Sequence, residues 1–102
     1  MKVKKYDKLV RDKIPQIIGE QGKKCTVYVA TGTDYHQRLS DKLTEEVQEF
    51  LQEPSVEELA DIQEVLLAIA ESNKWDLEAA RIEKNLNRGG FWRRYILQEV
   101  SE

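Results

Sequence analysis

The sequence contains one cysteine and one histidine in 102 residues, and it has no long hydrophobic run. A single cysteine, Cys25, excludes an internal disulfide and a thiolate zinc site. The single histidine, His36, belongs to no Glu-x-x-His motif, which excludes a di-iron carboxylate bundle. No apolar stretch approaches the roughly 20 residues of a transmembrane helix, and no apolar segment follows the basic start as in a secretory signal. A protein of the reducing cytoplasm, without a membrane partner, is expected.

The sequence also has no excess of positive charge. Its formal net charge is −3, so general binding to nucleic acid is not expected. Lysine and arginine are concentrated near both ends and acidic residues in the middle. If the ends fold over the centre, cations will surround an acidic site. With 40% hydrophobic and 34% charged residues, a chain of this length predicts one folded domain, residues 1–102.

Hydrophobic periodicity predicts an all-α protein. Apolar residues recur every three or four positions over about 34–53, and the pattern resumes after Ser55. Ser55 and Glu58 have the spacing of a capping box, which predicts the start of this next helix. An earlier short helix begins at Pro15. A fourth helix is expected over about 76–87, where two glycines stop it.

Two segments do not follow the helical pattern. Residues 24–31 are β-branched and aromatic, which favours an extended segment or one minor strand. Residues 91–100 are expected to form a short helix or an arm that packs elsewhere. Because one strand does not make a sheet, the expected architecture is a compact helical bundle with two central antiparallel helices, completed by dimerisation.

Acidic residues occur in two motifs on the two central helices, Glu45-Glu46-Val-Gln-Glu49 and Glu58-Leu-Ala-Asp61. Residues three or four positions apart share a helix face, and the two motifs lie close to the apolar sides of their helices. If these sides pack together, the carboxylates converge at the margin of the core. Such carboxylates repel unless a hard cation such as Mg²⁺ binds them. Two simpler interpretations are a solvated acidic face and, for Glu58, a capping role alone.

Cationic side chains suited to phosphate occur in two places. Lys84 and Arg88 lie on one face of the predicted fourth helix, with Asn87 beside them. Arg11 and Lys13 form a second group near the start of the chain. Arginine binds phosphate through two parallel hydrogen bonds, and lysine acts as a point charge. Both groups also suit ordinary solvated surface.

The two acidic motifs resemble the signature of the MazG-like all-α nucleoside triphosphate pyrophosphohydrolase superfamily. The opening Tyr6-Asp-Lys-Leu-Val-Arg-Asp-Lys-Ile-Pro15 and the late Lys84-x-x-x-Arg-Gly-Gly-Phe91 resemble its phosphoribosyl-ATP pyrophosphohydrolase-like branch. The three blocks span residues 6–91, and their order is strongly specific. The gap between the acidic motifs is shorter than is usual for MazG itself, which implies a smaller pocket for a base.

The resemblance implies an enzyme that requires Mg²⁺ or Mn²⁺ and forms a homodimer or homotetramer. It would hydrolyse a nucleoside triphosphate to the monophosphate and pyrophosphate, as in house-cleaning of non-canonical nucleotides. Carried over by position, the metal ligands would be Glu46, Glu49, Glu58 and Asp61, and Glu45 would be a further ligand or activate water. In the expected mechanism Glu45 or Glu49 accepts a proton from water. The substrate would be bound by Lys84, Asn87, Arg88, Arg11 and Lys13.

Three alternatives remain at the level of the sequence. The chain could be a nucleotide-binding or regulatory helical module without turnover. It could be a structural helical dimerisation domain with an acidic surface. Within the enzyme class, it could be a true phosphoribosyl-ATP pyrophosphohydrolase.

Overall fold

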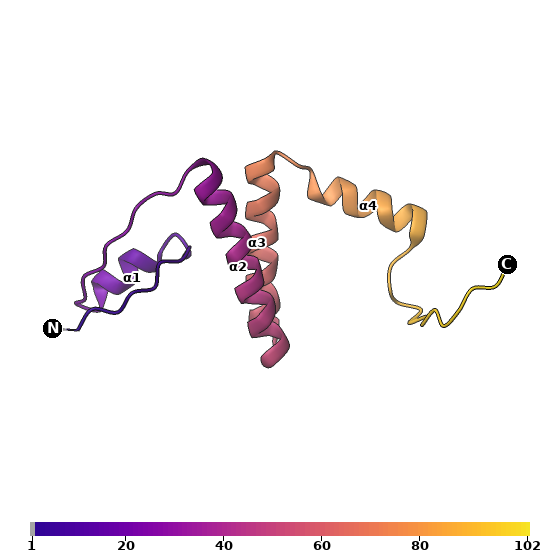
Figure 1. The fold of residues 1–102 in the computed structure, drawn as a ribbon, viewed down its shortest axis with the longest axis horizontal. Coiled ribbons are helices and arrows are strands. Elements are labelled where there is room, and N and C mark those ends of the chain that lie inside the picture. Colours follow the sequence, from indigo (N-terminus) through magenta and orange to yellow (C-terminus); the bar gives the residue numbers. More distant parts are fainter. Residues whose placement is uncertain (1) are drawn as a thin grey trace.

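The computed structural model describes residues 2–102 and is all-α (Figure 1). Its helices are α1 (Ile14–Glu20), α2 (Gly32–Gln52), α3 (Val56–Asn73) and α4 (Leu77–Arg88). Residues 24–31 have no regular secondary structure, and no strand forms anywhere in 2–102, so the minor strand considered for this segment is not formed. Within the same range, no helix combines the length and the apolar character needed to cross a membrane.

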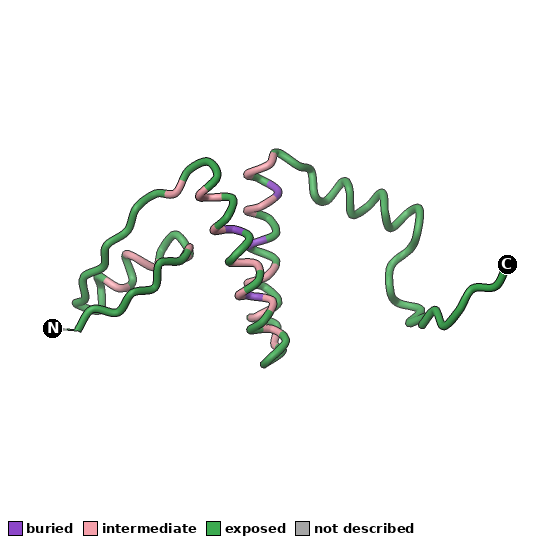
Figure 2. Tube along the Cα trace, in the orientation of Figure 1, coloured by how far each residue is buried: buried purple, intermediate pink, exposed green. Residues whose placement is uncertain are grey.

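Helices α2 and α3 form an antiparallel hairpin at the centre of the molecule (Figure 1). The hairpin contains the buried apolar side chains Leu39, Val65 and Ala70, and the purple segments of Figure 2 lie only there. Near the open end of the hairpin, the His36 ring and the Ser72 hydroxyl lie 3.0 Å apart and link the two helices. The two central antiparallel helices expected from the periodicity are confirmed.

Local capping explains where α3 and α4 begin. The Ser55 hydroxyl accepts a hydrogen bond from the Glu58 backbone N–H at 3.1 Å, and Asp76 accepts one from the Ala79 N–H at 3.0 Å. Each bond satisfies a donor in the first turn that has no partner within the helix. After α4 the chain turns at Gly89, whose φ of 78° favours glycine.

The N-terminal segment lies beside α2 (Figure 1). Arg38 of α2 holds it there by donating to the Asp7 backbone carbonyl at 2.6 Å. Asp34 accepts a second hydrogen bond from Arg38 at 3.2 Å and one from the Tyr28 hydroxyl at 2.8 Å. Arg38 therefore connects two segments that precede the hairpin to the first turns of α2.

Helix α4 and the residues after it extend away from the hairpin (Figure 1). None of the α4 residues is buried, and residues 91–100 form an exposed arm instead of a helix. The molecule measures 67 × 31 × 23 Å with a radius of gyration of 18.6 Å, whereas a compact domain of this length has about 13 Å. The single chain therefore buries little of its apolar surface outside the hairpin.

Candidate metal centre

Three carboxylates from α2 and α3 converge in the hairpin, as the two acidic motifs predict. Glu46 comes from α2, and Glu58 and Asp61 come from the first two turns of α3. One carboxylate oxygen of each lies within 4.8 Å of those of the other two. We call these three residues the acidic cluster. Ser55 contributes to its geometry because its cap fixes the start of α3 one turn before the cluster.

Burial separates this cluster from an ordinary acidic surface. Glu46 is 6% exposed, and Oε2 of Glu46 and Oε2 of Glu58 are buried without a hydrogen-bond partner in the described chain. Leaving a buried polar atom unsatisfied costs about 1–3 kcal/mol. Desolvation raises the pKa of Glu46, and the charges of Glu49 and Asp61 raise it further, against the lowering effect of Lys42. Oxygen donors in this arrangement fit a hard divalent cation.

Glu45 precedes the cluster and is held by two lysines. Lys8 Nζ lies 2.7 Å from Glu45 Oε1, and Lys42 Nζ lies 3.2 Å from Glu45 Oε2. Burial alone would raise the pKa of Glu45, but the hydrogen bonds from Lys8 and Lys42 outweigh it and lower the pKa. Lys42 also pairs with Glu46 at 3.2 Å. Lys42 was not among the residues expected at the site, although its position four residues before Glu46 on the same helix face indicates this pairing.

Glu49 is exposed and lies outside the acidic cluster. It is nevertheless close enough to contribute to the raised pKa of Glu46. The set expected from the sequence, Glu46, Glu49, Glu58 and Asp61, therefore divides into three convergent carboxylates and one peripheral one. Within the first motif, Glu46 is buried beside the α3 carboxylates, whereas Glu49 is exposed.

Among the expected phosphate-binding residues, Arg11 reaches the cluster. Its Nη2 lies 2.6 Å from Asp61 Oδ1, and its Nη1 lies 3.6 Å from Glu64 Oε1. These contacts and the Lys8 contact bring cations of the N-terminal segment to the acidic centre. Lys13, in contrast, is exposed at the start of α1.

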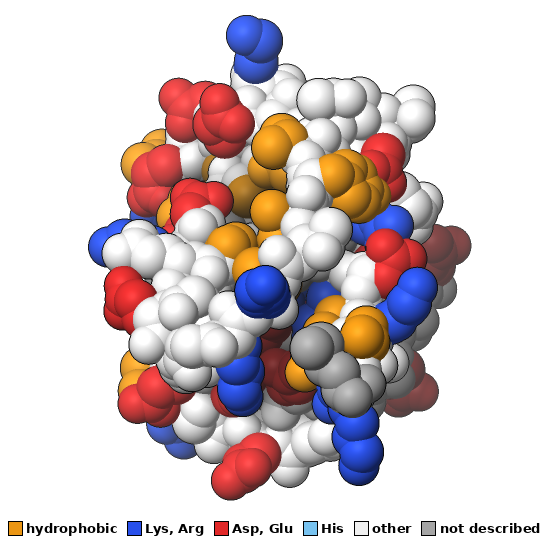
Figure 3. Space-filling model, turned by 90° about the vertical axis from the view of Figure 1, so that its left-hand side faces the viewer, with side chains coloured by type: hydrophobic (Ala, Val, Ile, Leu, Met, Phe, Trp, Pro, Cys, Tyr) orange, Lys and Arg blue, Asp and Glu red, His pale blue; other side chains and the backbone are white. Residues whose placement is uncertain are grey.

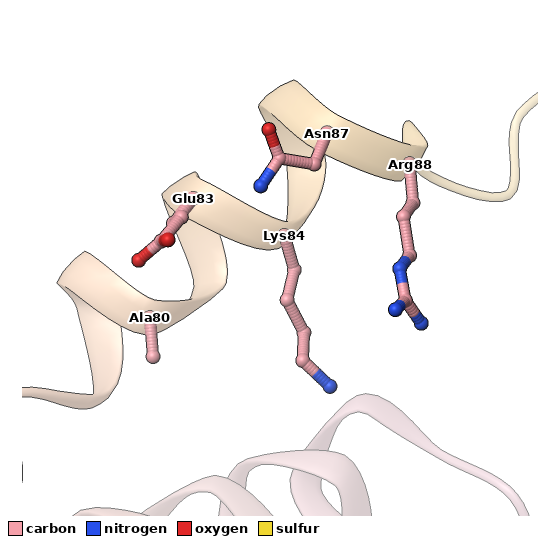
Figure 4. A pocket seen from close by; sticks show the side chains of 5 residues that line it. All are labelled: Ala80, Glu83, Lys84, Asn87 and Arg88. Carbon is pink, nitrogen blue, oxygen red and sulfur yellow. The ribbon is translucent and has the colours of Figure 1, made fainter.

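The other expected phosphate-binding residues surround a separate open hollow on α4 (Figure 4). Lys84 and Arg88 project to the same side, and the hollow is lined by Ala80, Glu83, Lys84, Asn87 and Arg88. Helix α4 leaves from the end of α3 opposite the acidic cluster (Figure 1). The single chain thus does not gather both predicted cationic groups around one centre.

Comparisons with protein families, with curated proteins and with solved structures give no match to this chain.

Proposed function

We propose that the acidic cluster binds Mg²⁺ or Mn²⁺ and that the protein hydrolyses a nucleoside triphosphate to the monophosphate and pyrophosphate. The observation that carries the proposal is the convergence of three carboxylates within 4.8 Å, with two buried oxygens that have no partner in residues 2–102. The resemblance of the two acidic motifs and their flanking blocks to the MazG-like superfamily supports the choice of reaction.

In this proposal Glu46, Glu58 and Asp61 hold the ion, and Glu49 is a peripheral ligand. A bound divalent ion supplies Lewis acidity at phosphate and lowers the pKa of water. Glu45 or Glu49 accepts the proton from water, and the lysine partners of Glu45 keep its carboxylate ionised. The cations proposed to bind the phosphates and stabilise the leaving pyrophosphate are Arg11, Lys13, Lys84 and Arg88, with Asn87 beside them.

A second copy of the chain is part of the proposal. Leu59 and Leu67 on α3 are 53% and 50% exposed, and Phe91 and Trp92 after α4 are 96% and 93% exposed. Apolar surface of this extent is characteristic of an interaction site. A homodimer or homotetramer would cover it and would allow α4 of one subunit to approach the acidic cluster of another.

The test is a pyrophosphate-release assay with canonical and damaged nucleoside triphosphates and phosphoribosyl-ATP, with and without Mg²⁺. Glu46→Gln and Asp61→Asn should each lower the metal-dependent rate about 100-fold or more, because each removes a charged ligand. The matched control is Glu71→Gln, which removes an exposed acid on α3 outside the cluster. This control should retain the wild-type rate.

The assay also separates the alternatives. Calorimetric binding of Mg²⁺-nucleotide without pyrophosphate release would identify a nucleotide-binding module. Binding of neither metal nor nucleotide would identify a structural helical domain. Selective turnover of phosphoribosyl-ATP would place the protein in histidine synthesis, and wild-type rates in Glu46→Gln and Asp61→Asn would reject the proposed ligands.

A further inference from the structure

The N-terminal segment places a guanidinium directly on the acidic cluster. Arg11 Nη2 lies 2.6 Å from Asp61 Oδ1, and Asp61 belongs to the cluster. The contact joins residues fifty positions apart. Figure 3 shows lysine and arginine side chains interspersed with acidic side chains on the face nearest the N-terminal segment.

Arg11 and a divalent ion would occupy the same carboxylate at this position. Both need a carboxylate oxygen of Asp61, and two cations on neighbouring sites repel. Even an ion that took the other oxygen of Asp61 would remain next to the guanidinium charge. Occupancy of the cluster by metal is therefore coupled to the position of Arg11.

The Arg11–Asp61 pair can also be displaced. The side chains of Arg11 and Asp61 are 52% and 35% exposed, and ion pairs of this exposure are weak. Glu64, one helical turn beyond Asp61, already lies 3.6 Å from the second guanidinium nitrogen. It is 59% exposed and lies outside the cluster. The guanidinium can thus retain one partner on α3 after giving up the other.

We propose that Arg11 competes with the divalent ion for Asp61 and thereby sets the metal affinity of the acidic cluster. Metal binding transfers Arg11 from Asp61 to Glu64 and solvent, where it becomes available to phosphate. This inference rests on the proposed function, since it requires a metal at the cluster. It adds a regulatory role for the N-terminal segment, because any ligand that attracts Arg11 also strengthens metal binding.

The first test measures the dissociation constant for Mn²⁺ by electron paramagnetic resonance of the free ion. Arg11→Gln should bind Mn²⁺ about three- to tenfold more tightly than the wild type, because a competing charge is removed. The matched control is Lys5→Gln, which removes one exposed charge from the same segment. It should change the dissociation constant by less than about twofold, as expected for a solvent-screened surface charge.

The second test uses the wild-type chain, so it does not depend on the folding of a variant. The Arg11 side-chain Nε–H resonance, assigned by its loss in Arg11→Gln, should move toward the position of free arginine when Mg²⁺ is added. A resonance that stays in place at saturating Mg²⁺ would overturn the proposal.

The outcomes distinguish this inference from the metal centre itself. If the wild type binds Mn²⁺ and Arg11→Gln binds it no more tightly than Lys5→Gln, Arg11 does not compete and the metal centre stands. If none of the three proteins binds Mn²⁺, both the metal centre and the competition fail. Tighter binding in Arg11→Gln alone, with intact helical circular dichroism, supports the competition.

Discussion

The Glu46 carboxylate is buried, and burial disfavours its ionised form. It is 6% exposed, and within residues 2–102 only one of its oxygens has a partner, Lys42. A carboxylate in this environment destabilises the fold at neutral pH because water can no longer solvate its charge. In the proposed function, a cation bound at the acidic cluster would offset this cost.

Glu46→Gln should stabilise the metal-free protein at pH 7 by roughly 1 kcal/mol, since it removes a poorly compensated buried charge. Desolvation raises the pKa of Glu46 in the folded state. Its destabilising effect is therefore fully present above that raised pKa and declines as the pH falls through it. The effect is lost below the unfolded-state pKa of 4.5, where the carboxyl is protonated in both states. The advantage of the variant, measured by urea unfolding, should shrink between pH 7 and pH 4.

The control for this prediction is Glu71→Gln on the exposed side of α3. It should change the free energy of unfolding by less than about 0.5 kcal/mol. A destabilised Glu46→Gln at pH 7 would show that the Lys42 ion pair more than compensates for the burial of Glu46.

The start of α3 shows how one element fixes the site. Ser55 caps the helix through the Glu58 N–H, and Glu58 and Asp61 then fall on one face because they are three residues apart. The cap thus determines where two of the three clustered carboxylates lie. Pro54 precedes it and prevents α2 from continuing into α3.

Ser55→Ala should lower the free energy of unfolding by about 1 kcal/mol, the usual value for loss of an N-cap. Ser55→Asp should retain stability, because aspartate accepts the same hydrogen bond. Ser40→Ala serves as the control, since the Ser40 hydroxyl only donates back to the His36 carbonyl within α2. Urea unfolding of the three variants measures the effect, and equal stability of Ser55→Ala and the wild type would contradict it.

At the scale of the whole molecule, the elongated shape leaves most large apolar side chains outside the hairpin exposed. The radius of gyration of 18.6 Å exceeds the compact value of about 13 Å, and α4 contains no buried residue. Association of such chains is favourable because it removes exposed apolar surface from water. We expect the folded state to be linked to assembly.

Sedimentation equilibrium should give a mass of at least twice the 11.9 kDa of one chain. The thermal midpoint should rise with protein concentration, as mass action requires for an oligomer that unfolds as it dissociates. Leu86→Ser, at an apolar position of α4 that is 81% exposed, should weaken the assembly. Gln48→Ser, at an exposed polar position of α2, should not. A monomer with a concentration-independent midpoint would contradict this prediction.

Much of the helical layout follows from the sequence alone. The predicted helix over 34–53 corresponds to α2 at Gly32–Gln52, and Ser55 caps α3 as the capping-box spacing predicts. The helix expected over about 76–87 corresponds to α4 at Leu77–Arg88. These features are predictable because periodicity, capping and proline act over a few neighbouring residues. The spacing of Glu58 and Asp61 on one helix face follows for the same reason.

The environment of each acid was decided by the tertiary structure. The rotation of α2 against α3 buries Glu46 while leaving Glu49 exposed. The path of the N-terminal segment brings Lys8 to Glu45 and Arg11 to Asp61. Contacts of this kind depend on how distant segments pack, and residue spacing within one helix contains no information about them. The sequence therefore determines which residues share a helix face, and the packing of the hairpin determines which of them meet.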